Sequence, residues 1–161
     1  TLNDSLFRCN ADGRFQAPGV YHAYSDDRLK ANEILITNAT NTLKKLKPQK
    51  YIKYFNFDLS GDFLEESGLI AQEVYYNAPE VRHLVSIDNS NTDVSDIILS
   101  DDLNNDPDYT ASGWGYKPAS IAYSGFIPYL IRSNQEQQEE IDSLKTKITE
   151  IEARLAALES A

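Results

Sequence analysis

A run of apolar residues near the carboxyl end of the chain recurs at alternating intervals of three and four. Its members are Ile141, Leu144, Ile148, Ile151, Leu155 and Leu158. This spacing is the a/d pattern of a coiled coil. Extended toward the amino end, the pattern places Asn134 at a and Gln137 at d. One heptad earlier in the chain, it places Ile127 at a and Leu130 at d. A helix with such a narrow apolar stripe has no reason to stand alone, so we expect it to associate with copies of itself.

Isoleucine occupies both a and d positions of this seam, which favours three or more strands over two. We therefore predict that residues 120–161 form a parallel trimeric coiled coil, with Asn134 and Gln137 as polar layers that set the register. Pro128 is compatible with a helix that begins just before it, because it falls in the first turn if Ser124 is the N-cap. The alternative is that the stripe packs back on the chain's own domain, but a strict two-in-seven seam is narrower than such a helix usually shows.

The segment between residues 25 and 119 alternates between helical and strand patterns. In chain order we predict a helix over 38–47, a hairpin of strands 51–57 and 67–70, a helix over 71–76 and a strand over 81–87. Pro48 ends the first helix, and Gly68 meets a backbone requirement of the hairpin. The aromatic cluster of Tyr51, Tyr54, Phe55 and Phe57 is expected in the core or an interface. The fold class is therefore α+β: a small mixed helix and hairpin domain, followed by the long helix.

Two further segments complete the organisation. Residues 1–24 are a short β preamble, with strands near 6–9 and 14–17 around a turn at 10–13. Because an isolated hairpin is marginal in water, we expect it to end an upstream β structure or to pair with its own copies. Residues 88–108 form a polar, acidic loop, and loops of this length are usually functional or mobile. The chain contains no methionine, not even at its start, which indicates a fragment of a larger polyprotein or fibre.

Composition excludes several classes of partner. The formal net charge is −10, and the one basic run, over residues 44–50, is best explained as a solvated helix end, so neither nucleic acid nor an anionic membrane is expected to bind. Cys9 is the single cysteine, and His22 and His83 are the two histidines. These numbers argue against a disulfide framework and against a metal site, and we predict no cofactor.

The junction between preamble and body carries the sequence Ser25-Asp26-Asp27-Arg28-Leu29-Lys30. Its simplest interpretation is an N-cap serine with two acids on the helix dipole. It also combines a hydroxyl nucleophile with an amine base. In one regular helix, residues five apart lie about 140° apart, so Ser25 and Lys30 would not share a face. Either Ser25 precedes the helix and the chain bends back, or Lys30 serves a neighbouring subunit.

Three motifs together resemble the intramolecular chaperone domain at the carboxyl end of phage tailspikes and tail fibres, of the endosialidase type, a peptidase family with a Ser–Lys dyad. The first is Ser25-Asp26-x-Arg28-Leu29-Lys30-x-Asn32, the second Gly68-Leu69-Ile70-Ala71-Gln72-Glu73-Val74 followed by Pro79-Glu80-Val81, and the third Tyr123 to Ile131 leading into the coiled coil. They span Ser25 to Ala161. The sequence departs from many members in having Glu33 between Asn32 and the apolar Ile34.

The resemblance implies a self-cleaving serine peptidase that acts once, on its own chain. Its domain trimerises, aids the folding of an upstream intertwined β fibre in the same polypeptide, and releases itself by cutting the Tyr24–Ser25 bond. Ser25 is the implied nucleophile and Lys30 the implied base. Supporting roles fall on Asp26, Arg28, Asn32, Gln72 and Glu73.

The same resemblance implies a viral fibre or tailspike precursor made in the host cell, from whose mature virion the released domain is absent. Two alternatives remain from different classes of function. One is a trimerisation and folding module that does not cleave, and the other is a receptor-binding fibre tip.

Overall fold

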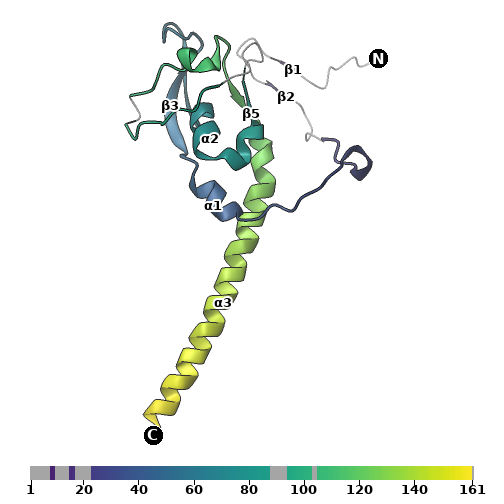
Figure 1. Cartoon of the computed structure of the whole chain (residues 1–161), viewed down its shortest axis with the longest axis vertical. Coiled ribbons are helices and arrows are strands. Elements are labelled where there is room, and N and C mark those ends of the chain that lie inside the picture. Colours follow the sequence, from purple (N-terminus) through teal and green to yellow (C-terminus); the bar gives the residue numbers. More distant parts are fainter. Residues whose placement is uncertain (1–7, 10–14, 17–22, 88–93, 103–104, 161) are drawn as a thin grey trace. The chain divides into compact units, whose positions relative to one another are not determined.

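The computed structural model describes residues 8–9, 15–16, 23–87, 94–102 and 105–160. The chain divides into two compact units, Thr1–Leu35 and Ile36–Ala161, and each is described by itself. Figure 1 labels those helices and strands for which there is room. The predicted division of the chain at residues 24 and 119 stays a prediction.

The first unit contains a short strand pair and one turn of helix. Strand β1 (Arg8–Cys9) pairs antiparallel with β2 (Phe15–Gln16), with Cys9 opposite Phe15. This pairing agrees with the predicted preamble hairpin, while the predicted turn at 10–13 lies outside the described residues. The 3₁₀ helix η1 spans Asp27–Leu29.

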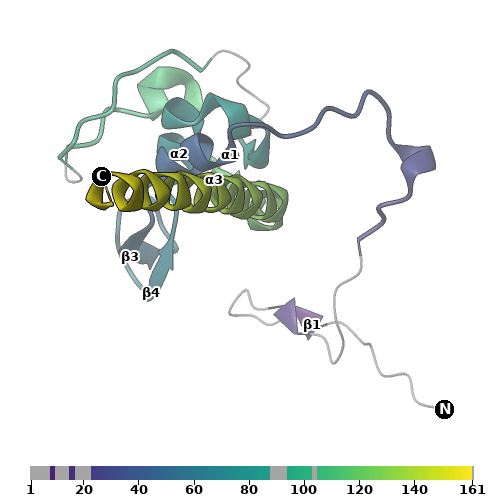
Figure 2. The same ribbon diagram turned by 90° about the horizontal axis from the view of Figure 1, so that it is seen from below.

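The second unit combines short helices with two small antiparallel sheets and one long helix (Figures 1 and 2). Its elements are α1 (Ala39–Lys44), β3 (Gln49–Tyr54), β4 (Phe63–Gly68), α2 (Ala71–Asn77), the 3₁₀ helix η2 (Pro79–Leu84), β5 (Val85–Ser86), the helical turn η3 (Thr110–Trp114), β6 (Ser120–Ile121), the 3₁₀ helix η4 (Tyr123–Phe126) and α3 (Ile127–Glu159). Strands β3 and β4 form a hairpin in which Tyr54 lies opposite Phe63, and β5 pairs with β6. The α+β class predicted from the sequence is confirmed.

The core lies where α2, η2 and the start of α3 meet. Its buried members are Val74, Ala78, Val81, Leu84 and Phe126. Gly125 allows the closest approach in this core, because a β-carbon at that position would lie 2.2 Å from Leu84 Cδ2. A larger residue there would push η4 away from η2.

The predicted strand over 81–87 is wrong for its first four residues, which belong to η2. Pro79 stands at the start of that helix, where its fixed φ favours a helical turn. Val81 and Leu84 are three residues apart, so one face of a 3₁₀ helix buries both. Only Val85 and Ser86 form a strand.

The other predicted elements are present with shifted ends. Helix α1 ends three residues before the predicted end at Lys47, and α2 matches its prediction to within one residue. Strand β3 starts at Gln49 and ends at Tyr54, and β4 runs over 63–68 where 67–70 was predicted. The turn between the two strands therefore lies earlier in the chain than predicted. Within this turn, Leu59 takes a left-handed conformation, and Asp58 Oδ1 accepts hydrogen bonds from the backbone and side chain of Ser60.

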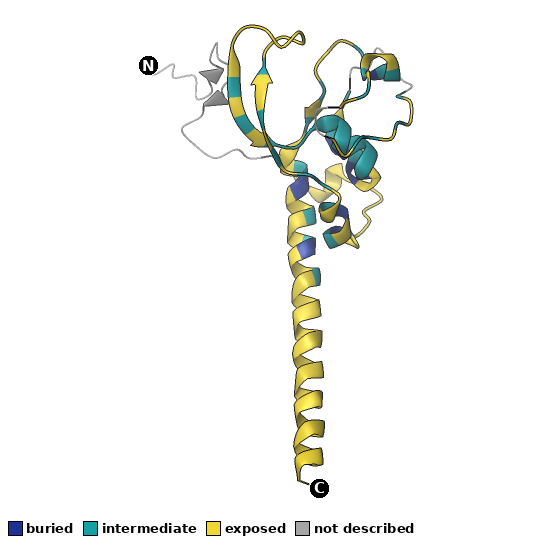
Figure 3. Ribbon diagram, turned by 90° about the vertical axis from the view of Figure 1, so that its left-hand side faces the viewer, coloured by how far each residue is buried: buried dark blue, intermediate teal, exposed yellow. Residues whose placement is uncertain are grey.

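Helix α3 is 33 residues long and projects from the body of its unit (Figure 3). The predicted long helix is therefore confirmed. Ser124 is not its N-cap but lies inside η4, and Pro128 falls in the first turn of α3 as expected. Within the described part of the chain, no helix is both long and apolar enough to cross a membrane.

A carboxylate of α3 caps the amino end of α1. Glu136 accepts hydrogen bonds from the backbone N–H of Ala39 at 3.0 Å and of Thr40 at 2.9 Å. The residue in the N-cap position, Asn38, makes no capping bond with its own side chain. The Thr40 hydroxyl lies 3.0 Å from that of Ser133, which joins the same two helices. Two of the four N–H groups that a helix start leaves unpaired are thus satisfied from another helix.

The Glu136 contact predicts an acid-dependent loss of stability. The backbone N–H of Thr40 is the main cause that lowers the pKa of Glu136 to about 2 from its ordinary 4.5. Because the folded-state pKa is depressed, the stabilisation is complete above pH 4.5 and disappears as the pH falls toward 2. Glu136→Gln should lower the melting temperature at pH 7 by about 2–4 °C, as expected for a lost cap in a chain of this size.

Melting curves at equal protein concentration between pH 7 and pH 2.5 check this. The difference between wild type and Glu136→Gln should shrink as the pH falls. Glu150→Gln is the matched control, since Glu150 occupies the same heptad position on α3 and is exposed. An equal loss in both variants, or a difference that does not change with pH, would contradict the capping role.

Candidate functional site

The side chains of Ser25 and Lys30 meet in the first unit. Lys30 Nζ lies 2.8 Å from Ser25 Oγ and 3.0 Å from the Ser25 carbonyl oxygen. Both residues are exposed in the single chain. The separation of amine and hydroxyl is within the range needed for direct proton transfer between a nucleophile and its base.

A tight turn brings the two side chains together. The backbone N–H of Leu29 donates to the Asp26 carbonyl at 3.1 Å, and that of Lys30 donates to the Asp27 carbonyl at 2.9 Å. Lys30 itself is extended, with φ −122° and ψ 156°. The three helical residues therefore reverse the chain, and Lys30 then reaches back to Ser25. Of the two alternatives that the spacing left open, the structure has the contact within one chain.

Asp26 and Arg28 close this turn. Asp26 Oδ1 accepts from the Arg28 backbone N–H at 2.9 Å and from Arg28 Nε at 3.0 Å, and Oδ2 accepts from Nη2 at 2.6 Å. These bonds to Arg28 lower the pKa of Asp26. Asp26 is thus the N-cap that the sequence assigned to Ser25, which leaves the Ser25 hydroxyl to Lys30. The Arg28 guanidinium is engaged by a carboxylate.

The residues on either side of the turn are open. The Tyr24 side chain is 98% exposed, so the predicted cleavage site is accessible. Asn32 has a φ of 57°, a left-handed conformation that asparagine tolerates better than most residues. The chain therefore changes direction two residues after Lys30.

Gln72 and Glu73 belong to the second unit, on α2. Glu73 accepts a hydrogen bond from the Gln49 side chain, which ties α2 to the start of β3. Burial raises the pKa of Glu73. Gln72 is half-buried and lines a hollow beside the β3–β4 hairpin together with Tyr123. The bond to Gln49 gives Glu73 a role in holding the body together.

The second and third sequence motifs pack on each other at Gly68. The Leu69 backbone N–H donates to the Tyr123 hydroxyl at 2.9 Å. A β-carbon on Gly68 would lie 2.4 Å from that oxygen and 2.7 Å from the Tyr51 hydroxyl. The requirement for glycine is therefore one of space beside two tyrosines, whereas the sequence suggested a requirement of the backbone.

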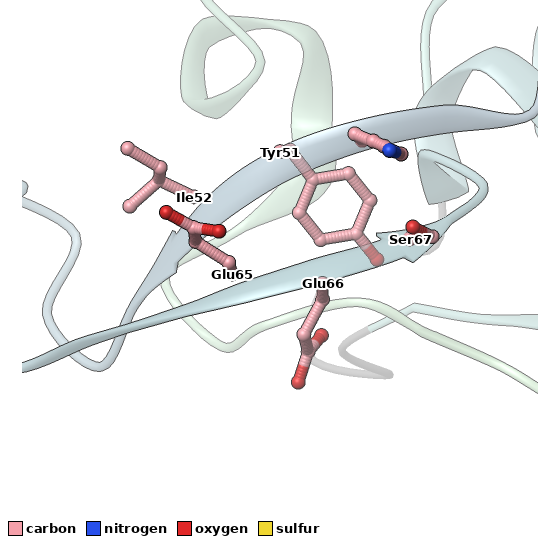
Figure 4. A pocket seen from close by; sticks show the side chains of 6 residues that line it. Tyr51, Ile52, Glu65, Glu66 and Ser67 are labelled. Carbon is pink, nitrogen blue, oxygen red and sulfur yellow. The ribbon is translucent and has the colours of Figure 1, made fainter.

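A shallow hollow lies on the β3–β4 hairpin, lined by Lys50, Tyr51, Ile52, Glu65, Glu66 and Ser67 (Figure 4). Lys53 pairs with Glu66 at 3.3 Å. The hollow mixes both signs of charge with apolar groups. Further along the hairpin, Phe55 and Phe57 are 57% and 70% exposed, so in the single chain they are not part of the core as the sequence allowed.

Trp114 follows the acidic segment 88–108 and anchors it to the body. The sequence analysis did not identify this role of Trp114. Its ring is 3% exposed, and its Nε1 donates to the Tyr76 hydroxyl at 2.7 Å. Tyr76 in turn donates to the Ser95 carbonyl at 3.0 Å. The described part of the segment is thus tied to α2. A single tryptophan after a long polar stretch was the available signal.

The predicted trimer seam is uncovered in the single chain (Figure 3). Its apolar members are 45–75% exposed: Ile127, Leu130, Ile141, Leu144, Ile148, Ile151, Leu155 and Leu158. Asn134 and Gln137 between them are also exposed. Helix α1 contacts α3 through Ser133 and Glu136, which lie outside the a and d positions. The body therefore packs beside the seam without occupying it.

Comparisons with models of protein families, with curated proteins and with solved structures found no significant match for this chain. The resemblance to self-cleaving chaperone domains accordingly stays a prediction. A functional proposal for this chain therefore rests on the geometry of the Ser25–Lys30 contact and on the exposed seam of α3.

Proposed function

We propose that this chain is an intramolecular chaperone that trimerises through α3, aids the folding of an upstream β fibre and then cuts its own Tyr24–Ser25 bond. The observation that carries the proposal is the contact of 2.8 Å between Lys30 Nζ and Ser25 Oγ across a turn closed by Asp26 and Arg28. Five residues in a regular helix would not make this contact.

The proposed chemistry is an N-to-O acyl shift followed by hydrolysis. The uncharged Lys30 amine takes the Ser25 hydroxyl proton as Oγ attacks the Tyr24 carbonyl carbon. The Tyr24–Ser25 C–N bond then breaks, and the Ser25 amine leaves with the proton that Lys30 returns. Water hydrolyses the resulting ester to a Tyr24 carboxylate and restores the Ser25 hydroxyl. Because nucleophile and carbonyl are tethered in one chain, their proximity is supplied covalently.

The open seam of α3 supports the trimer. Eight apolar residues at a and d positions stay 45–75% exposed, and exposed apolar stripes of this length mark an interface. Isoleucine at both positions favours three strands. A trimer would bring three copies of any upstream segment together in register.

A second candidate is a trimerisation module that does not cleave. The exposure of Ser25 and Lys30 favours it, because a lysine in water keeps its proton and an amine must lose that proton to act as a base. In the first candidate, assembly has to supply the dry environment that the single chain lacks.

Hydroxylamine distinguishes the two candidates, because at neutral pH it attacks esters and leaves peptide bonds intact. Added to the folded chain, it should speed cleavage at Tyr24–Ser25 and leave a hydroxamate on Tyr24, detected by mass spectrometry. Ser25→Ala, which cannot form the ester, is the control and should stay whole. Wild-type chain that remains uncut and unmodified in hydroxylamine would favour the non-cleaving module.

A further inference from the structure

The charged residues that flank the seam of α3 match a particular arrangement of neighbouring chains. In a parallel coiled coil, a residue at g contacts the residue at e of the following heptad in the neighbouring helix, five positions further on. Three such pairs in the charged part of α3 have opposite signs. They are Glu140 with Lys145, Lys147 with Glu152, and Arg154 with Glu159. This complementarity specifies parallel chains in register.

The first pair of the same ladder is apolar. Phe126, a buried residue at the end of η4, precedes Ile127 and occupies the g position, and five positions further on Ile131 occupies e. Ile131 is 56% exposed, although it belongs to neither the a nor the d positions. The seam alone therefore gives this isoleucine nothing to contact.

An open apolar groove is lined in part by Phe126, the g residue that a neighbour's Ile131 would face in a parallel coiled coil. It has a volume of about 650 Å³ and is lined mainly by Leu43, Leu46, Leu69, Tyr123, Phe126 and Leu130. Leu130 belongs to both the groove and the seam, so the two surfaces are continuous. Ile131 of the same chain is not among the residues that line the groove.

The next step of the ladder is polar on both sides. A second hollow next to the groove is lined by residues that include Thr40, Ser133, Asn134 and Gln137. Ser133 is at g, and its partner position in a neighbour is Gln138. An apolar groove thus faces an isoleucine. A hollow of mixed lining, in which Leu43 and Leu130 accompany the polar residues, faces a glutamine.

We propose that, in the assembled protein, Ile131 of each copy packs into the groove between α1, β4 and α3 of the next copy. This contact rests on the trimer of the proposed function and extends its interface from the coiled coil onto the body. Assembly then stabilises the packing of α1 and of the Gly68–Leu69 segment, because both line the groove. The interface would transmit the presence of a third chain from α3 to the hairpin.

Sedimentation equilibrium of the full chain tests the contact. Ile131→Asp should weaken the trimer roughly tenfold or more, since a charge replaces a buried isoleucine in three places. Gln135→Asp is the matched control, because it adds the same charge on the same helix at an exposed b position. Equal effects of the two variants would overturn the groove contact, whereas wild-type chain that stays monomeric would overturn the trimer itself and the contact with it.

A cross-link gives an independent reading that does not depend on stability. In a Cys9→Ser background, the pair Leu43→Cys and Ile131→Cys should form disulfides between copies under mild oxidation and give covalent trimers on a non-reducing gel. Leu43→Cys with Gln135→Cys should give far fewer. If the doubly substituted chains sediment as trimers but the thiol introduced by Ile131→Cys forms no disulfide to another copy, the proposal is contradicted.

Discussion

Replacing Ser25 by alanine should abolish the proposed cleavage of the Tyr24–Ser25 bond, and replacing Lys30 by alanine should slow it by about 10²–10⁴-fold, the usual contribution of a general base. The first change removes the only hydroxyl within the proposed small ring. The second removes the amine that lies 2.8 Å from that hydroxyl. Both variants should still assemble, because neither residue lies on α3. Cleavage followed on denaturing gels over time measures the effect.

Two further variants make this result specific. Lys30→Arg keeps a positive charge and hydrogen-bond donors but cannot give up its proton, so it should be as inactive as Lys30→Ala. Asp27→Ala changes a residue of the same turn whose backbone carbonyl, and not its side chain, accepts from Lys30, so it should cleave nearly normally. If Lys30→Ala cuts at the wild-type rate, Lys30 is not the base.

Ile148→Asp has the second large effect and should leave the chain monomeric. Three aspartates in one layer of a trimer would bury unpaired charges, which costs far more than the layer contributes. Ile148 lies in the middle of the apolar run and is 54% exposed in the single chain, so its replacement should spare the fold of the body. Thr149→Asp is the control, since Thr149 is also β-branched and exposed but lies at b.

The same pair of variants tests whether assembly controls cleavage. The Ser25–Lys30 contact forms within one chain, so trimerisation is not needed to bring the two side chains together. It is needed, in our account, to remove water from an exposed pair. Ile148→Asp should therefore cleave slowly, and Thr149→Asp at the normal rate. A monomer that cuts as fast as wild type would remove assembly from the mechanism.

The parts of the fold that depend on local periodicity could be predicted from the sequence. The heptads of α3, the β3–β4 hairpin and α2 each bury or expose residues at a fixed interval, and that interval is visible in the chain. The prediction failed at residues 81–84, because a short run with two apolar residues, Val81 and Leu84, is compatible with a short helix as well as with a strand. Pro79 was the residue that distinguished the two.

Contacts between distant residues could not be predicted in this way. Glu136 looks like any charged residue of an exposed helix until α1 is seen to start beside it. Gly68 looks like a turn residue until the hydroxyls of Tyr51 and Tyr123 are seen to occupy the space of its side chain. Both depend on where another element packs, which no local pattern encodes.

The candidate site shows the same division. The sequence indicated which residue types could react, but a helical interval of five placed Ser25 and Lys30 on different faces. The turn that joins them depends on Asp26 taking the N-cap and binding Arg28 through its whole carboxylate. The side chain that caps the turn therefore decides which neighbour the Ser25 hydroxyl meets.

The most direct test of the account is the mass of the wild-type chain, measured on freshly purified protein and again after incubation at concentrations where it is trimeric. Self-cleavage predicts two products, one that ends at Tyr24 and one that begins at Ser25, and neither in Ser25→Ala. A trimeric wild-type chain that keeps its full mass, with Ser25 and Lys30 intact, would contradict the proposed function.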